Sequence, residues 1–221
     1  MAPVKIHGSP LSTCTQAIMV VAKEIGVQYE IVPVNFAIAE HKSPEFLKLQ
    51  PFGQVPVLVE EDGFKLFESR AISRYLISKY GAESNLIPKG LKENATFEQA
   101  ASIETSNFYP YASGLSAEKV FKPMRGVKGD DARAEEYSNT LEEKLKGYEA
   151  ILSKQKYLAG NTLTLADLLH LPYGTLITAR LGFKGFEKYP SVAAWWNDIS
   201  SRATWKEVQG EAQAALAALS K

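Results

Sequence analysis

The hydrophobic periodicity of the chain changes near residue 81, and this change limits the folds that the sequence can adopt. Before it, short β-like runs alternate with helical patterns in the order β-α-β-loop-β-β-α. A polar segment containing Pro88 and Gly90 follows, and beyond it only helical patterns occur. The sequence therefore predicts a small α/β domain at 1–82, a linker at 83–91 and an all-helical domain at 92–221.

The first domain is expected to alternate strands and helices around one sheet. Strands are predicted at 4–7, 29–32, 55–59 and 65–67. Helices are predicted at 15–25, for one turn at 44–49, and from Ser69, as the N-cap, to Tyr80. The first two strands should be parallel, because a helix joins them as a right-handed crossover. The turn Glu61-Asp62-Gly63 should join the last two strands in a hairpin.

The second domain is expected to contain only helices. They are predicted at 92–116, 132–153, from 164, at 192–201 and at 205–219, with a charged loop at 122–131. Thr164 and Asp167 have the spacing of a capping box that starts a buried helix. The side chains expected in the core of this domain are His170, Trp195, Trp196 and Trp205.

Composition excludes several classes of function. The 221 residues are 45% hydrophobic, and 25 basic residues balance 25 acidic ones, so the chain lacks the basic excess typical of nucleic-acid or anionic-membrane binding. We expect a cytosolic protein, because no signal peptide, membrane span or C-terminal targeting signal is recognisable. The single cysteine, Cys14, and the scattered histidines His7, His41 and His170 argue against a disulfide or a metal site.

Several short motifs of the first domain lie in its loops and at the starts of its helices, where a thioredoxin-like fold would place a thiol-binding site. They are Ser12-Thr13-Cys14, EHKSPE at 40–45, PFGQVP at 51–56 and FESRAI at 67–72. The helical domain adds FKPM at 121–124, LAG at 158–160 and LAD at 165–167. Together, at these spacings, the motifs resemble the glutathione transferases, and specifically the phi class. The resemblance covers essentially the whole chain and implies a thioredoxin-like N-terminal domain followed by an all-α C-terminal domain.

The resemblance implies a binding site for glutathione, as co-substrate, in the first domain and no bound cofactor. The residues it assigns to glutathione are His41, Lys42, Gln54, Val55, Pro56, Glu68 and Ser69. Their chemistry fits, because a tripeptide with two carboxylates and one amine needs cations and N–H donors at its ends. His41 and Lys42 suit the glycine carboxylate, and Ser69 at a helix N-terminus suits the γ-glutamyl carboxylate.

The remaining groups complete this expected site. Glu68 can pair with the γ-glutamyl amine, and Gln54 can add a hydrogen bond. The Val55-Pro56 bond should be cis, as in thioredoxin-like folds, which leaves the backbone of Val55 to pair with the cysteinyl part of the ligand. Each residue alone would also suit an ordinary structural role, such as a surface pair, an N-cap or a strand-edge proline. Their joint order and spacing favour the binding site.

Thiolate stabilisation is assigned to Ser12 by the family pattern. A hydroxyl donor and the N-terminus of a helix both favour the anion of a thiol. Thr13 is the nearest rival donor. Cys14 is interpreted as a small buried helix residue that turns away from the site, and His7 as a residue that lines the site or packs in the core.

The resemblance also implies an apolar co-substrate site between the domains. Its candidate residues are Leu11, Phe108, Tyr109, Tyr111, Leu115 and Phe121. Phe52 is expected to insert into a partner subunit, which implies a homodimer. The implied reaction is attack of the glutathione thiolate on an electrophilic carbon or on a peroxide. Two alternatives stay open at this stage: a non-catalytic carrier of glutathione and apolar ligands, and a thiol transferase that uses Cys14.

Overall fold

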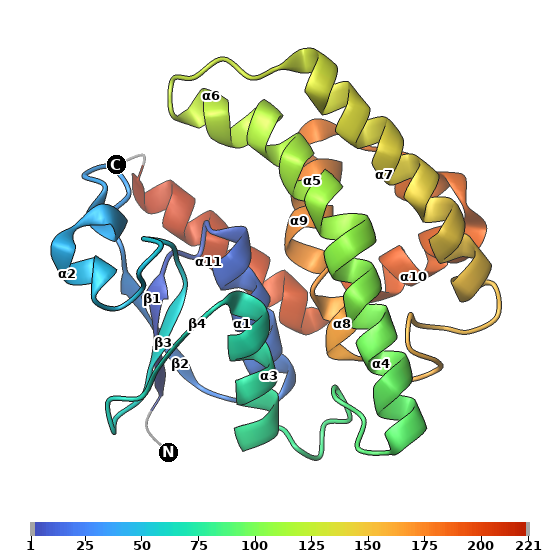
Figure 1. Cartoon of the computed structure of the whole chain (residues 1–221), viewed down its shortest axis with the longest axis horizontal. Helices are drawn as coiled ribbons and strands as arrows, with labels where there is room; N and C mark the ends of the chain where they lie inside the picture. The colour runs from blue at the N-terminus through green and yellow to red at the C-terminus, as the bar shows by residue number, and fades with distance from the viewer. Residues whose placement is uncertain (1–2, 220–221) are drawn as a thin grey trace. The chain divides into compact units, whose positions relative to one another are not determined.

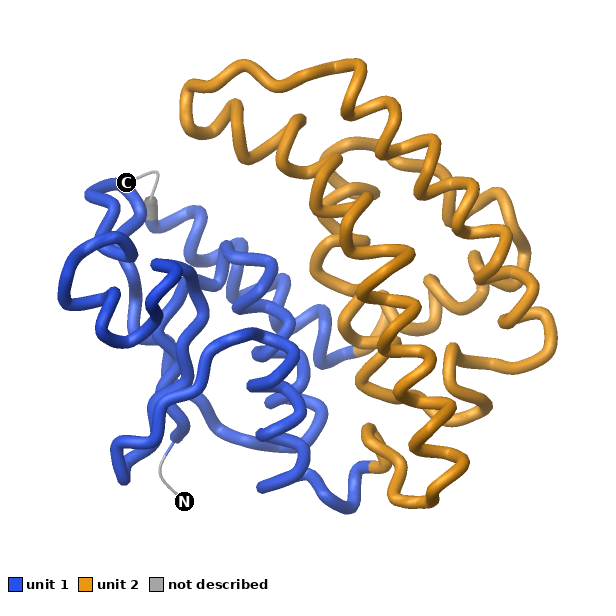
Figure 2. The backbone as a smooth tube through the Cα atoms, viewed as in Figure 1, with its two compact units in different colours: residues 1–84, 203–221 blue, residues 85–202 orange. Residues whose placement is uncertain are grey.

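The computed structural model describes residues 3–219, which divide into two units (Figure 2). Unit 1 contains residues 3–84 and 203–219, and unit 2 contains residues 85–202. The division differs from the sequence-based one at the end of the chain. The final helix, α11 (Ala203–Leu219), belongs to the unit that contains the N-terminal region, and not to the helical unit.

Unit 1 is built on a four-stranded sheet with the order β2-β1-β3-β4 (Figure 1). The strands are β1 (Val4–Gly8), β2 (Tyr29–Pro33), β3 (Val57–Val59) and β4 (Lys65–Phe67). β1 runs parallel to β2 and antiparallel to β3, and β3 and β4 form an antiparallel hairpin. The predicted parallel pair and hairpin are therefore confirmed. β3 begins two residues later than predicted, after Pro56, which has no N–H to donate to a strand ladder.

Helices cover both faces of this sheet. They are α1 (Thr13–Glu24), α2 (Pro44–Leu47) and α3 (Ser69–Tyr80). The main core joins the sheet to α1 and α3 through buried apolar side chains: Val4, Ile6, Ile18, Ala22, Leu58, Ile72 and Leu76. A smaller cluster of Val34, Phe46 and Val57 joins the sheet to α2. Adjacent residues of a strand point to opposite faces, so Val57 and Leu58 contribute to different clusters.

Unit 2 is helical throughout, as predicted. Its helices are α4 (Leu91–Ile103), α5 (Tyr109–Ser116), α6 (Lys122–Met124), α7 (Asp131–Leu152), α8 (Leu165–Leu168), α9 (Leu171–Thr175) and α10 (Pro190–Ser200). The single helix predicted at 92–116 is interrupted by a π-helical turn at 104–108 and continues through a second one at 117–121. The charged loop therefore begins after Met124 rather than at Lys122. Glu118 holds this loop, because its carboxylate accepts the N–H of Asp130 at 2.9 Å.

The core of unit 2 is organised around Asp167, which is fully buried. The predicted capping box is present, and Asp167 Oδ2 accepts hydrogen bonds from the N–H and the hydroxyl of Thr164. Oδ1 accepts bonds from the Leu158 N–H and the Trp195 indole N–H, each at 3.0 Å. These donors satisfy a carboxylate that would otherwise be costly to bury.

His170 is also buried in this core, as predicted. Its ring nitrogens lie 2.8 Å from the Ala166 carbonyl oxygen and 2.9 Å from the Tyr148 hydroxyl. Because a carbonyl can only accept, Nδ1 is the donor to Ala166. Trp196 is only half-buried, and Trp205 is buried in unit 1 rather than in the helical unit, because it lies on α11.

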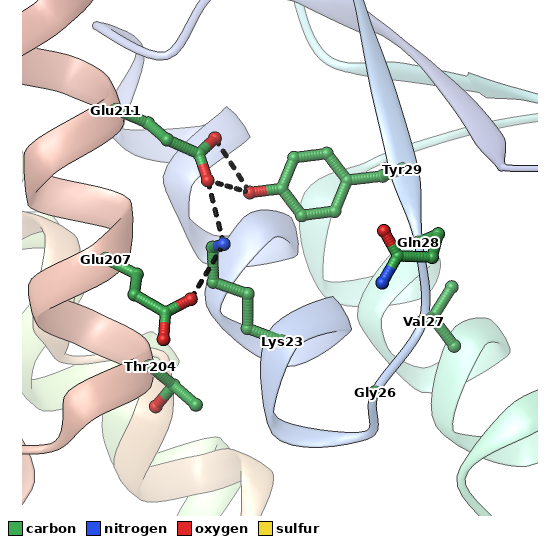
Figure 3. A pocket seen from close by; sticks show the side chains of 8 residues that line it. All are labelled: Lys23, Gly26, Val27, Gln28, Tyr29, Thr204, Glu207 and Glu211. Carbon is green, nitrogen blue, oxygen red and sulfur yellow. Dashed lines mark hydrogen bonds and ion pairs between the residues drawn. The ribbon is translucent and has the colours of Figure 1, made fainter.

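A polar cluster attaches α11 to the rest of unit 1, and Figure 3 shows it from close by. The Lys23 ammonium, at the end of α1, lies 3.0 Å from Glu207 Oε2 and 2.8 Å from Glu211 Oε1. The Tyr29 hydroxyl of β2 donates to Glu211 at 2.9 Å. These side chains line a cavity of about 320 Å³. Contacts of this kind explain why α11 belongs to unit 1.

This cluster predicts a stability that depends on alkaline pH. Burial alone lowers the pKa of Lys23, but its hydrogen bonds to Glu211 and Glu207 outweigh burial and raise that pKa above the ordinary value. Burial and the bond to Glu211 also raise the pKa of Tyr29. A raised folded-state pKa stabilises the fold below the unfolded-state pKa, and the stabilisation is lost as pH rises through the folded-state value. The cluster should therefore stabilise unit 1 up to about pH 10 and lose its effect above it.

Urea unfolding of the wild type and of Glu211→Gln, measured from neutral to alkaline pH, tests this expectation. Glu211→Gln should unfold at lower urea at neutral pH, and the difference should shrink above about pH 10. Glu30→Gln, at an exposed position on β2, is the control and should match the wild type throughout. If the difference in urea unfolding between Glu211→Gln and the wild type stays constant into the alkaline range, the proposed dependence of stability on pH is contradicted.

Candidate functional site

The strand register brings the motifs of unit 1 to one end of the sheet. His7 of β1 is paired with Val57 of β3, and Val57 is paired with Phe67 of β4. The turn before α1 therefore starts beside the residues that precede β3 and the residues that follow β4. The Val55-Pro56 peptide bond at this end is cis, as predicted from the sequence.

The EHK segment at 40–42 reaches the same end of the sheet by packing on the loop before Pro56. The Lys42 ammonium donates a hydrogen bond to the Phe52 carbonyl at 2.9 Å. Gly53 has a φ of +61°, and a Cβ there would lie 2.6 Å from the His41 carbonyl oxygen. Only glycine fits this close approach. The Gln50 side chain orders the loop further, because it accepts the Gln54 N–H at 3.1 Å.

Two cationic or donor side chains thus stand next to the cis-proline loop. Lys42 is exposed, and His41 is half-buried with its ring 5.0 Å from the ring of Phe36, edge to face. Phe36, Gln50 and Gly53, which support these residues, were not predicted from the sequence to do so. A glycine before a valine-proline pair was the one available signal, since it suggests a close backbone approach.

Ser12 occupies the N-cap of α1. Its Oγ accepts the Thr15 N–H at 3.3 Å, which uses an acceptor position and leaves the hydroxyl hydrogen to donate elsewhere. Because of this cap, α1 begins at Thr13 and not at Thr15 as predicted. Thr13, the rival donor, is buried, whereas Ser12 is half-buried.

The N-terminus of α3 differs in detail from the sequence prediction. Glu68, and not Ser69, is the N-cap, and Ser69 is the first helical residue. Glu68 is exposed and has a φ of +71°, a region that residues with a Cβ rarely adopt. Such backbone outliers occur mainly where a site requires them. This arrangement presents the Glu68 carboxylate and the first N–H groups of α3 at the same place.

Cys14, in the first turn of α1, is half-buried. The side chains of Arg70, Thr13 and Ser69 are close enough to its thiol to influence its pKa. Burial nevertheless raises the pKa of the Cys14 thiol, which therefore stays protonated at neutral pH. His7 is half-buried, and burial together with Lys5 lowers its pKa, so its ring is neutral.

The residues predicted to contact an apolar co-substrate have different environments. In unit 1, Leu11 is half-buried and directly precedes Ser12. In unit 2, Phe108 has no exposed surface and packs 4.5 Å from the His170 ring, and Leu115 is also buried. The members of this set that keep exposed surface in unit 2 are Tyr109, Tyr111 and Phe121. Phe108 and Leu115 thus form part of the helical core.

Phe52 differs from the other aromatic residues of unit 1 in its exposure. Its side chain is 64% exposed, although it lies on the loop that also holds Lys42. Its ring meets the ring of Phe67 edge to face, at 6.4 Å. The loop before β3 therefore carries both a part of the candidate site and an unburied aromatic side chain.

Comparisons with known proteins define the family. The Glutathione S-transferase N-terminal domain matches residues 2–78, and the Glutathione S-transferase C-terminal domain matches residues 112–203. Glutathione S-transferase PM239X14 of Arabidopsis thaliana is 53% identical over 199 residues, which cover 89% of this chain and 91% of the relative. The crystal structure of glutathione transferase F7 from Populus trichocarpa covers 95% of this chain and 99% of its own, with 36% identity and a TM-score of 0.90.

A second solved structure carries a ligand. Glutathione S-transferase I from mais, in complex with an atrazine glutathione conjugate, covers 96% of this chain and 99% of its own, with 37% identity and a TM-score of 0.88. The fold is thus that of a protein with a thioredoxin-like first domain and a helical second one. The chain belongs to the glutathione S-transferase family, is of the phi type, and is a transferase that conjugates glutathione. Among residues 3–219, no helix is long and apolar enough to cross a membrane.

The environment of Cys14 predicts that its thiol takes no part in turnover. Cys14→Ser should keep conjugation of an activated aryl halide within a few-fold of wild type, because conjugation needs only the thiolate of glutathione. Mass spectrometry after treatment with oxidised glutathione should find little modification of the wild type, since a half-buried, protonated thiol attacks disulfides slowly. Rapid stoichiometric modification, together with a disulfide-reductase activity that Cys14→Ser loses, would overturn this expectation.

Proposed function

We propose that the protein is a serine-type glutathione transferase in which Ser12 stabilises the thiolate of bound glutathione. The observation that carries the proposal is the capping geometry of Ser12: its oxygen is engaged by the Thr15 N–H, and its hydrogen remains available for a sulfur acceptor. Ser12 also stands at the positive end of the α1 dipole, which favours an anion. Ser12 acts as a hydrogen-bond donor and not as a nucleophile.

The need for such a donor follows from the chemistry of thiols. A free thiol has a pKa of about 8.5, so most of it is protonated at neutral pH. The thiolate is the nucleophile, and a donor that favours the anion lowers the pKa and raises the reactive fraction. The protein then needs no covalent intermediate: it holds the thiolate against the acceptor and stabilises its charge.

Both ends of glutathione find partners of suitable charge in unit 1. His41 and Lys42 are assigned to the glycine carboxylate, and their position beside the Gln54-Val55-Pro56 segment supports this assignment. The backbone of Val55 and the exposed Gln54 side chain are assigned to the cysteinyl residue, because an extended ligand can pair with a strand edge.

The γ-glutamyl end is assigned to the N-terminus of α3. The first N–H groups of a helix and the Ser69 hydroxyl suit its carboxylate, and the Glu68 carboxylate suits its amine. The positive φ of Glu68 supports this role. Glu68 occupies the N-cap position, but its carboxylate makes no capping hydrogen bond to the helix. The two ends of the ligand are thus recognised by different motifs.

We assign the second substrate to the class of hydrophobic electrophiles, with peroxides as further acceptors. Leu11 is the apolar residue next to Ser12 and is the candidate contact in unit 1. In unit 2, Tyr109, Tyr111 and Phe121 keep exposed surface for an apolar ligand. Membership of the glutathione S-transferase family and the presence of Ser12 at the helix cap both favour catalysis over the non-catalytic carrier. The raised pKa of Cys14 disfavours the thiol-transferase alternative.

We also propose that two copies of the chain form a homodimer in the cytosol. Phe52 supports the dimer, because a large aromatic side chain that is 64% exposed is a typical anchor for a partner surface. The single cysteine and the balanced charge support the compartment, since reduced thiols are typical of cytosolic proteins.

The role of Ser12 is tested by Ser12→Ala. Turnover with an activated aryl halide should fall by about 10²–10³, as for loss of one donor to a developing anion, while the Kd for glutathione changes little. The thiol pKa of bound glutathione, read from thiolate absorbance, should rise. Asp130→Ala, which removes the N-cap of α7 in unit 2, is the control and should leave the thiol pKa unchanged. An unchanged turnover and pH profile in Ser12→Ala would remove Ser12 from the mechanism.

The dimer is tested by Phe52→Ala in sedimentation experiments at micromolar concentration. Removal of an aromatic anchor that the partner subunit buries should shift the protein from dimer toward monomer. Phe64→Ala is a matched control in unit 1, because Phe64 is 41% exposed on the hairpin and packs on Tyr75. It should leave association unchanged. A monomeric wild type, or a Phe52→Ala dimer as tight as wild type, would defeat the proposal.

A further inference from the structure

The residues just before Ser12 form a tight turn. The Ser12 N–H donates to the Ser9 carbonyl at 2.9 Å, so Pro10 and Leu11 occupy the two central positions. Proline at the first central position is favoured, because its φ is already set near the required value. The turn joins the end of β1 to the start of α1, and its conformation determines where Ser12 stands relative to both.

Both ends of the central peptide of this turn are held by side chains. The Leu11 N–H donates to Ser9 Oγ at 3.2 Å. At the other end, Gln16 Nε2 donates to the Pro10 carbonyl oxygen at 2.7 Å. Gln16 is half-buried and lies in the first turns of α1, and its own N–H donates to the Ser12 carbonyl at 2.9 Å. One residue therefore contacts the turn before Ser12 through its side chain and Ser12 itself through its backbone.

The peptide plane between the two central residues of a tight turn can adopt more than one orientation. The two common turn types with proline in the first central position differ by rotation of this peptide plane. Leu11 disfavours the flipped form, since that form needs a positive φ at its position. Smaller tilts of the plane remain, and each one displaces the peptide that carries Ser12. The hydrogen bond from Gln16 limits these tilts, because it binds the carbonyl end of the plane to α1.

We infer that Gln16 is a positioning residue for Ser12, which it acts on by tying the Pro10 carbonyl to the helix that Ser12 caps. This inference rests on the proposed role of Ser12 and adds a residue to it. Gln16 needs no contact with glutathione or with the electrophile. It fixes the direction in which the Ser12 hydroxyl donates, and a misdirected donor stabilises the thiolate less.

The primary test is Gln16→Leu, which removes the donor without adding charge and keeps a similar volume. Loss of one positioning hydrogen bond should lower kcat/KM about five- to tenfold. The thiol pKa of bound glutathione should rise in the same variant, while its Kd for glutathione stays near that of wild type. Gln213→Leu, at an exposed position on α11, is the matched control and should change none of these quantities.

A double-mutant cycle with Ser12→Ala separates positioning from a general structural effect. If Gln16 acts through Ser12, then Gln16→Leu has no further effect on the thiol pKa or on kcat/KM once Ser12 is alanine. An equal loss in both backgrounds would overturn the inference, and so would a Gln16→Leu enzyme with the wild-type thiol pKa. If the wild type conjugates glutathione and Ser12→Ala does so equally well, the proposed role of Ser12 is contradicted, independently of the result for Gln16→Leu.

Ser9→Ala gives an independent variant, in case Gln16→Leu folds poorly. Ser9 Oγ holds the opposite end of the same peptide, so its loss should shift the thiol pKa in the same direction. Melting temperatures of all variants are measured alongside. A Ser9→Ala enzyme that keeps the wild-type thiol pKa and turnover would show that the peptide plane needs no such support, and would contradict the inference.

Discussion

The pairing of β3 between β1 and β4 is the constraint on which the candidate site depends. Because His7, Val57 and Phe67 are in register, the turn before Ser12, the cis Val55-Pro56 bond and the N-terminus of α3 meet at one end of the sheet. A shift of one residue would turn every side chain of the short strand β3 to the other face. Val57 and Leu58 prevent such a shift, since they are buried in clusters on opposite faces of the sheet.

Around this end of the sheet, side chains hold the backbone in place. Gln50 orders the segment before Pro56, Lys42 ties it to the EHK segment, and Gln16 ties the Pro10 carbonyl to α1. In unit 2, Asp167 has the corresponding structural task, because its carboxylate collects donors from a loop, a helix start and Trp195. Polar groups that are fully satisfied specify one arrangement of the chain around them.

The sequence predicted the architecture well because periodicity and turn residues are local signals. The order of strands and helices along the first domain, the parallel pair, the hairpin, the cis proline and the Thr164–Asp167 capping box are all confirmed. The failures involve interactions between distant residues. The contacts of Lys23 with Glu207 and Glu211 assign α11 to unit 1, and no local pattern reveals that attachment.

The sequence by itself determined which chemical groups are present and in which order: a capping serine, a His-Lys pair, a valine-proline pair and a Glu-Ser pair at a helix start. Only the tertiary structure decided which of these groups are exposed to solvent and which hydrogen bonds they make. Ser12 is more exposed than Thr13, burial raises the pKa of the Cys14 thiol, and Phe108 is buried in the helical core. The physical reason is that hydrogen-bond partners and solvent access are set by neighbours from other segments, whereas residue type and local spacing belong to the chain alone.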